Sequence, residues 1–196
     1  LAGNKATIDD YYKKNKYPAE FGGGNIIIGG RECKIIECGD FSPVRFGEVS
    51  KKAGALAAAA IETSVEITLS GEFDAMGTMP VAKESLYLAG WNYPGHTEML
   101  ADRCGIEKPL MILTSGQIRV ALETIHIPLR EVPDSITTES LRKTIRIFNT
   151  SLKKDFGHQK PAIAMLGLNP HAGESGNIGR EEIETLKPAI DKSCLD

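Results

Sequence analysis

From Gly47 onward, short apolar runs alternate along the chain with longer segments in which apolar residues recur about every 3.6 positions. The apolar runs predict buried strands over residues 73–79, 109–114, 118–124 and 161–167. The periodic segments predict helices over residues 47–67 and 97–103. They also predict a short helix that follows residues 80–84 and ends at Ala89, a longer one that follows Thr137 and ends near Lys154, and one from Glu181 onward. Alternating helices and strands are typical of α/β folds, so we expect a mixed or parallel sheet with helices on both faces.

Two of these helices have additional signals. The first is rich in alanine between Ala55 and Ala60, so it has high helix propensity and little bulk and can lie close against a sheet. The helix that ends near Lys154 has an apolar stripe, and Thr137 offers N-cap chemistry before it. Residues 1–24 are polar, with a short helix expected over Ile8–Lys14. Two short strands are expected next, over residues 25–28 and 34–38, with a glycine turn between them.

Composition places the chain among ordinary globular proteins. It has 196 residues, of which 41% are hydrophobic and 25% charged, enough for one large domain or two small ones. The net charge is −3 and the basic residues are scattered, so nucleic-acid binding is not expected. No apolar run approaches the ~20 residues of a membrane span, so no membrane partner is expected either.

The four cysteines are Cys33, Cys38, Cys104 and Cys194, and none forms a C-x-x-C pair. A zinc ribbon or a redox motif is therefore not expected. Because the chain is neither small nor dense in cysteine, we expect reduced thiols and a cytoplasmic location.

A loop with histidine, glycine and charge follows the last predicted strand. It runs from Leu168 to Glu182, between a strand and a helix, an arrangement that places ligands at strand ends in α/β sheets. Its glycines fall as G-x-x-G-x-x-G, which is not the G-x-G-x-x-G dinucleotide fingerprint. The composition of the loop therefore marks a candidate anion or metal site, although loops of this kind most often only turn the chain.

Three of the four histidines, His96, His126 and His171, flank or follow predicted strands, whereas His158 lies in a polar connector. Neutral imidazole is a common metal ligand, and residues far apart in sequence can converge in the fold. The alternative is that each is an isolated loop residue, and spacing alone does not separate the two interpretations. Lys83, at a strand–helix junction, could meet an anionic substrate or simply be exposed.

Four motifs occur in a characteristic order. They are Pro80-Val81-Ala82-Lys83-Glu84, Tyr93-Pro94-Gly95-His96-Thr97-Glu98, the segment from Arg119 to Arg130, and Leu166-Gly167-Leu168-Asn169-Pro170-His171-Ala172-Gly173-Glu174. Together they resemble the 4-hydroxythreonine-4-phosphate dehydrogenase family, the PdxA-like proteins. The resemblance extends from about Gly47 to about Asp191 and is loose over residues 1–46.

The resemblance implies a three-layer α/β/α fold similar to isocitrate and isopropylmalate dehydrogenases. It implies two α/β domains, here residues 1–88 and 89–196, in a homodimer with its active site at the interface. It further implies oxidation of the C3 hydroxyl of a phosphorylated hydroxy acid with NAD and a divalent metal such as zinc, magnesium or cobalt. For the type member, loss of carbon dioxide from the 3-oxo acid follows, within pyridoxal phosphate biosynthesis.

The resemblance also assigns site residues. His96 and Thr97 match a pair that contacts substrate, and His126 and His171 match two of three metal-binding histidines. Lys83 lies in a matching motif and is a candidate catalytic residue for proton transfer or carboxylate contact, without a role carried over.

The chain departs from the family pattern at both ends. The opening Gly-Asp-Pro-Ala-Gly-Ile-Gly-Pro-Glu segment and the later His-Asp-Gln-Gly segment, with the third histidine, have no match. We therefore expect an α/β fold that is incomplete at both ends, with residues 1–80 incompletely packed. Substrates related to the expected 4-phosphohydroxy-L-threonine are 4-phospho-D-threonate and 4-phospho-D-erythronate. Two other possibilities are an inactive fragment that only binds ligand or dimerises and, more distantly, a metal-dependent hydrolase with Glu174 as base.

Overall fold

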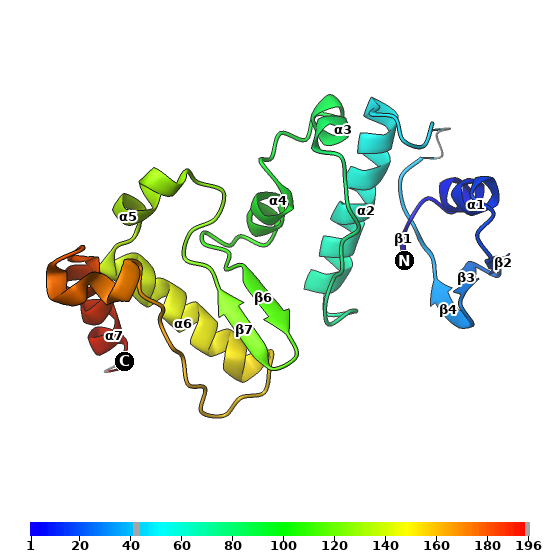
Figure 1. Cartoon of the computed structure of the whole chain (residues 1–196). Helices are drawn as coiled ribbons and strands as arrows, with labels where there is room; N and C mark the ends of the chain where they lie inside the picture. The colour runs from blue at the N-terminus through cyan, green and yellow to red at the C-terminus, as the bar shows by residue number, and fades with distance from the viewer. Residues whose placement is uncertain (41–43, 195–196) are drawn as a thin grey trace. The chain divides into compact units, whose positions relative to one another are not determined.

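The computed structural model describes residues 1–40 and 44–194 and divides into two compact units, Leu1–Pro109 and Leu110–Asp196 (Figure 1). The division expected from the sequence, between residues 88 and 89, falls within the first unit and remains a prediction for the complete fold. Residues 195–196, at the end of the expected second domain, lie outside the described ranges. Within those ranges, no helix has both the length and the apolarity needed to cross a membrane.

The first unit begins with short strands around one helix and continues with further helices. Its elements are β1 (Ala2–Gly3), α1 (Lys5–Lys14), β2 (Glu20–Gly22), β3 (Asn25–Ile28), β4 (Arg31–Lys34), β5 (Ile36–Glu37), α2 (Lys51–Leu69), α3 (Lys83–Leu88) and α4 (His96–Arg103). β1 pairs with β5 in parallel, and β3 lies between β2 and β4 in an antiparallel sheet. Ile26, at the centre of that sheet, is fully buried. The predicted helix near Ile8–Lys14 and the predicted strand over residues 25–28 are confirmed.

Helix α2 approaches α3 closely because a glycine lies where the two backbones meet. A Cβ atom on Gly54 would lie far inside van der Waals contact distance of the Ser85 carbonyl oxygen. The N–H of Ser50 donates to Ser85 Oγ at 3.2 Å, while Ser50 Oγ accepts from Ala53 N–H and caps α2. The alanine-rich sequence predicts close packing against a sheet, whereas this close approach is to helix α3.

The strand predicted over residues 73–79 is not formed. Among the described residues this segment has no ladder partner, and its apolar side chains are exposed, with Met79 at 78%, except that of Met76, which is half-buried. The prediction was wrong because an apolar run gives a chain the tendency to extend, whereas a strand also needs a neighbouring backbone with which to pair.

The second unit packs a hairpin and several helices around one small core. Its elements are β6 (Ile112–Ser115), β7 (Ile118–Ala121), the 3₁₀ turn η1 (Leu129–Glu131), α5 (Val132–Ser135), α6 (Thr138–Lys154), the turn η2 (Pro170–Gly176), the π-helical turn η3 (Glu182–Leu186) and α7 (Lys187–Ser193). The strands predicted over residues 109–114 and 118–124 are confirmed, and they pair as an antiparallel hairpin with Ile112 opposite Ala121. The core contains Leu141, Leu186 and Ala189, against which Met165 and Leu168 pack.

Helix α6 starts where its sequence predicts. Thr137 Oγ1 accepts from Ser140 N–H at 3.0 Å, and Ser140 Oγ accepts from Thr137 N–H at 3.1 Å, which completes a capping box. The apolar stripe is buried at Leu141, Phe148 and Leu152. Cap and stripe together fix the position of the helix under the hairpin.

The strand predicted over residues 161–167 is also not formed, for the same reason as at residues 73–79. Its side chains alternate between half-buried and exposed, as in a strand, and Ile163 and Met165 belong to the half-buried set. Leu166, on the other side, is 82% exposed. Within the described part of the chain the segment has no ladder partner, so the described residues form three small sheets in place of one central sheet.

Candidate active site

Lys83 and His96 line the same small pocket of the first unit. Lys83 is the first residue of α3 and His96 is the first residue of α4. The pocket has a volume of about 60 Å³ and is lined by Val81, Lys83, Leu86, Trp91, Tyr93, Gly95, His96 and Met99. A Cβ atom on Gly95 would lie 3.7 Å from Lys83 Nζ and 2.8 Å from Glu98 Oε2, so an ammonium and a carboxylate both approach this turn.

The ring of His96 has a polar atom without a partner. Its Nε2 is buried, and no hydrogen bond to it is formed by any residue in ranges 1–40 and 44–194. Since buried polar atoms are nearly always hydrogen-bonded, this atom marks a position where a ligand group could bind. Thr97, the other residue expected to contact substrate, is the half-buried neighbour of His96 on α4.

The wall of this pocket is fixed by polar contacts to helices α2 and α4. Tyr93 donates its hydroxyl proton to Asp102 at 2.6 Å, and this hydrogen bond, helped by partial burial, raises the pKa of Tyr93. Arg103 pairs with Glu62 of α2 at 2.7 Å and lies over the ring of Trp91, 5.0 Å from its centroid. The segment that contributes Trp91 and Tyr93 is therefore held beside the first residues of α4.

His126 and His171, in the second unit, share an uncommon backbone conformation. His126 is exposed, follows the end of β7, and has a φ of 56°. His171 is exposed in turn η2 and has a φ of 51°. Left-handed backbone is rare outside glycine, and such conformations gather at functional sites. Both predicted metal ligands are thus in loops whose shape is imposed by the fold.

The backbone around His171 makes a left-handed turn that continues to Ser175. All five residues have φ between 45° and 76°, and only Gly173 adopts this region at no steric cost. For the others the conformation costs roughly 1–2 kcal/mol each. A side chain at Gly173 would also meet the Gly179 carbonyl oxygen at 2.6 Å.

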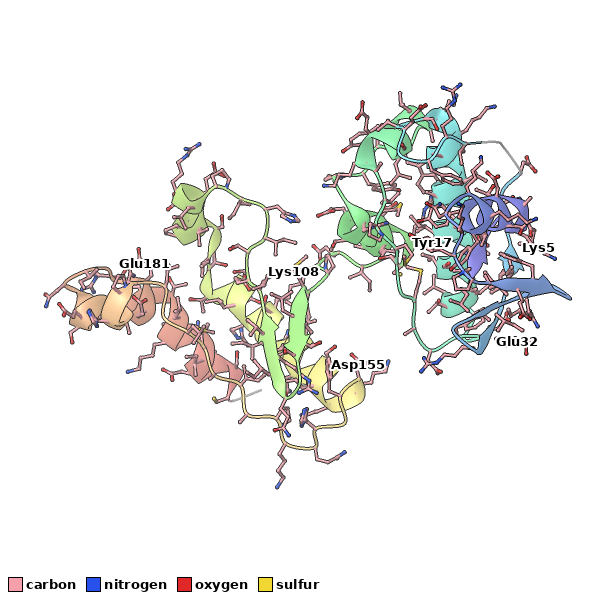
Figure 2. The ribbon with its side chains drawn as sticks, turned by 45° about the vertical axis from the view of Figure 1, so that its right-hand side comes forward. Lys5, Tyr17, Glu32, Lys108, Asp155 and Glu181 are labelled. Carbon is pink, nitrogen blue, oxygen red and sulfur yellow. The ribbon has the colours of Figure 1, made fainter. Side chains whose placement is uncertain are left out.

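A carboxylate and an amide hold the start of this turn. Glu182 Oε1 accepts from the N–H groups of Leu168 and Asn169 at 2.8 and 2.7 Å, and Glu182 Oε2 accepts from Asn169 Nδ2 at 2.9 Å. The same Nδ2 donates to Glu181 at 2.7 Å. Glu181, which directly precedes η3, is labelled in Figure 2. Hydrogen bonds from the backbone and side chain of Asn169 lower the pKa of Glu182 below its ordinary value of 4.5.

The support from Glu182 makes the turn sensitive to acid. A lowered folded-state pKa means that the ionised carboxylate stabilises the turn above pH 4.5 and that this contribution is lost as pH falls through the folded pKa. We expect Glu182→Gln to speed hydrogen exchange of the Leu168 and Asn169 amides on the order of tenfold at pH 7. NMR-detected exchange between pH 7 and pH 3 measures this.

The matched control is Glu174→Gln, in the same loop but with an exposed side chain. It should leave exchange at both amides unchanged. Equal protection in the Glu182→Gln and wild-type proteins at pH 7 would show that the carboxylate does not hold the turn.

The described residues do not assemble a complete metal site. Across residues 1–40 and 44–194, no group of three or more histidine, cysteine, aspartate or glutamate side chains lies in an arrangement that could hold a metal ion. Neither the His126 ring nor the His171 ring makes a hydrogen bond or ion pair with a described residue, so their nitrogens are available. The chemistry of two such imidazoles suits zinc or cobalt as part of a larger ligand set.

A family comparison decides what these motifs belong to. The model of the "Pyridoxal phosphate biosynthetic protein PdxA" family matches residues 4–194, almost the whole chain. The chain belongs to the PdxA family. The match includes residues 4–46, where the sequence motifs alone resemble the family only loosely.

Curated relatives of this chain are named 4-hydroxythreonine-4-phosphate dehydrogenase. The 4-hydroxythreonine-4-phosphate dehydrogenase of Chromobacterium violaceum is 45% identical over 150 residues, which are 76% of this chain and 46% of that PdxA relative. The chain therefore spans about half the length of the curated relatives that it matches. Among solved structures, the enzyme of that name from Klebsiella pneumoniae is 32% identical with a TM-score of 0.87, over 99% of this chain and 60% of its own. The enzyme of that name from Burkholderia phymatum is 37% identical with a TM-score of 0.73, over 83% of this chain and 49% of its own. The α/β fold of the chain is thus the fold of PdxA dehydrogenases.

The groups that shape the PdxA turn at His171 are not apparent in the sequence. Glu182 and Asn169 act through hydrogen bonds, and the only signal for them was an Asn-Pro pair followed by a Glu-Glu pair twelve residues later. The left-handed run had a partial signal in Gly173, since glycine is the residue that most readily adopts it. Local sequence thus marks the candidate ligand, but its support depends on the folded loop.

Proposed function

We propose that the protein carrying this chain oxidises and decarboxylates 4-phosphohydroxy-L-threonine with NAD and a divalent metal, in pyridoxal phosphate biosynthesis. The observation that carries the proposal is the family match over residues 4–194, with His96, Thr97, His126 and His171 at the motif positions. A related dehydrogenase of 4-phospho-D-threonate or 4-phospho-D-erythronate is the alternative substrate assignment.

The first unit would bind the substrate. The unpartnered Nε2 of His96 can hydrogen-bond a substrate oxygen, and Thr97 adds a hydroxyl beside it. In the oxidation, the C3 hydroxyl would lose a proton, and a bound NAD would supply the acceptor for the hydride that C3 gives up. The 3-oxo acid then releases its carboxylate as carbon dioxide and takes up a proton at the α-carbon. The role of the protein is to orient the reacting carbon and to accept and return the protons.

The second unit would hold the metal through His126 and His171, with further ligands from outside the described residues. A bound divalent cation supplies Lewis-acid stabilisation of negative charge on the C3 oxygen. Both histidines have left-handed backbone and exposed side chains, and no residue in ranges 1–40 and 44–194 hydrogen-bonds to either ring. The candidate cations are zinc, magnesium and cobalt.

An assay of NADH formation tests the proposal directly. The protein is incubated with NAD and each of the three phosphorylated acids, before and after treatment with a chelator. We expect turnover of 4-phosphohydroxy-L-threonine that stops on chelation and returns when metal is added back. Turnover that survives complete metal removal would contradict the mechanism, and preference for a phosphorylated threonate or erythronate would select the alternative.

Lys83 is part of the proposed substrate pocket, as a proton-transfer group or a carboxylate contact. We expect Lys83→Met to lower kcat/KM on the order of 100-fold, since charge and proton-transfer capacity are both lost. Lys83→Arg separates the roles: a carboxylate contact predicts recovery of KM, whereas proton transfer predicts a low kcat and an altered pH profile.

The control for Lys83 is Lys51→Met, at the exposed start of α2 in the same unit. It should leave the kinetic constants unchanged. If Lys83→Met has wild-type kcat and KM, Lys83 has no part in the site.

Assembly and location are further parts of the proposal. A homodimer with its active site at the interface follows from the family resemblance, and light scattering of the purified protein measures its mass. We propose a cytoplasmic location, because the low cysteine content favours reduced thiols. Since the chain spans about half the length of its curated relatives, ligand binding or dimerisation without turnover by these residues alone is the second candidate function.

A further inference from the structure

An ammonium and a carboxylate of the first unit approach the same glycine. Lys83 begins α3, and the half-buried Glu98 lies in the first turn of α4. From the position that a Cβ atom on Gly95 would occupy, Glu98 Oε2 is 2.8 Å away and Lys83 Nζ is 3.7 Å away. Because both distances start from one point, the two charges lie within the ~8 Å over which charges interact at physiological ionic strength.

Both charges are without another partner in the part of the chain that the structure describes. There, neither the Lys83 ammonium nor the Glu98 carboxylate forms a hydrogen bond or an ion pair. Helix capping does not explain where Glu98 lies, since within the same residues no hydrogen bond from the Gly95 N–H to this carboxylate completes a capping box. Each charge is therefore available to the other.

The glycine at position 95 is not required by its backbone conformation. Its φ of −168° and ψ of −178° are extended backbone, which alanine also adopts. What a side chain would meet there is the Glu98 carboxylate, with the Lys83 ammonium next to it. The missing side chain thus lets the ammonium and the carboxylate approach the same place.

We propose that Glu98 is a positioning residue for Lys83, with its carboxylate holding the ammonium at the Gly95 turn. The proposal rests on the proposed dehydrogenase function, in which Lys83 transfers a proton or contacts a carboxylate. Lys83 is exposed and its charge lies at the end of a flexible four-carbon stem, so it needs a partner to keep one position. Held by Glu98, the ammonium stays at the pocket that Lys83 shares with His96. A preset position lowers the entropy that is lost when the reacting groups are ordered.

The first experiment measures how available the Lys83 amine is, and it needs no turnover. The protein is treated with a trace of acetic anhydride, and peptide mass spectrometry gives the rate of acetylation at each lysine. An amine held by a carboxylate reacts slowly, because it must leave the carboxylate before it attacks the reagent. We expect Glu98→Gln to raise the acetylation rate of Lys83 about threefold. The rate at Lys51, exposed at the start of α2, should not change.

Gly95→Ala tests the same contact without removing a charge. The added methyl group meets only the flexible ends of the Glu98 and Lys83 side chains, so the thermal midpoint should stay near that of wild type. The displaced carboxylate should still let the acetylation rate of Lys83 rise about threefold. Two controls should react like wild type: Glu84→Gln, which removes an exposed carboxylate next to Lys83 in α3, and Gly77→Ala, where a Cβ atom meets nothing within 4 Å.

A double-mutant cycle on turnover tests whether Glu98 acts through Lys83. Glu98→Gln should lower kcat/KM of the proposed dehydrogenase on the order of tenfold when Lys83 is present. In the Lys83→Met protein, the same substitution should have almost no further effect, because the residue through which Glu98 acts is gone.

Three results would overturn the proposal. The first is a wild-type acetylation rate of Lys83 in Glu98→Gln or Gly95→Ala, which would leave Glu98 as a residue that only stabilises the start of α4. The second is an equal rise in Glu84→Gln, since any loss of negative charge would then suffice. The third is full additivity of the two substitutions on kcat/KM. Altered acetylation in a protein that forms no NADH would support the positioning role and contradict the proposed activity, so the two failures are distinguishable.

Discussion

Gly54→Ala is expected to lower the free energy of unfolding by about 3 kcal/mol or more, because the added methyl group meets backbone that cannot rotate away. The clash is with the carbonyl of Ser85, so relief requires α2 and α3 to separate. The hydrogen bond from Ser50 N–H to Ser85 Oγ would then be lost as well. Thermal unfolding followed by circular dichroism should show a midpoint roughly 10 °C below wild type.

The sign of the change in unfolding free energy distinguishes the two possible outcomes. Alanine is favoured over glycine inside a helix by about 1 kcal/mol, so without the close approach the variant would be more stable than wild type. Gly77→Ala is the control, since a Cβ atom there meets nothing within 4 Å. A Gly54→Ala protein as stable as wild type would show that α2 and α3 are not in close contact.

His126→Asn and His171→Asn are each expected to lower kcat/KM of the proposed dehydrogenase on the order of 1000-fold, by removing a metal ligand. Asparagine suits this test because it tolerates left-handed backbone, which both positions have. The thermal midpoint should therefore stay near that of wild type. Calorimetric titration with zinc or cobalt should show weaker binding in both variants.

His158→Asn is the matched control, because His158 is exposed in a connector of the same unit. It should keep both activity and metal affinity. Metal affinity that is unchanged in His126→Asn or His171→Asn would remove that residue from the proposed ligand set.

Helices were predictable from sequence because their signals are local. The cap at Thr137 and the stripe of α6 lie within the helix that they specify, and both are found where expected. The strands over residues 73–79 and 161–167 were predicted wrongly because a strand depends on a partner elsewhere. An apolar run shows that a segment can extend, but it does not show which backbone pairs with it.

The residues of the candidate site were predictable from sequence, whereas the contacts that support them were not. His96, Thr97, His126 and His171 could be named from motifs, and the structure places His96 beside Lys83 in one pocket. The contacts that position them were not predictable, because Glu182 reaches Leu168 across fourteen positions of sequence. Nor does any sequence pattern show that His96 Nε2 would be buried without a partner.

The left-handed turn from His171 to Ser175 also limits which sequences this loop can accept during evolution. Ala172, Glu174 and Ser175 have backbone angles in which a branched β-carbon is excluded, whatever space surrounds the side chain. Mutational drift at these three positions is therefore confined to glycine, asparagine, aspartate and a few unbranched residues. In an alignment of related sequences, these positions would vary little because of their backbone conformation. The pattern would resemble conservation of side-chain chemistry.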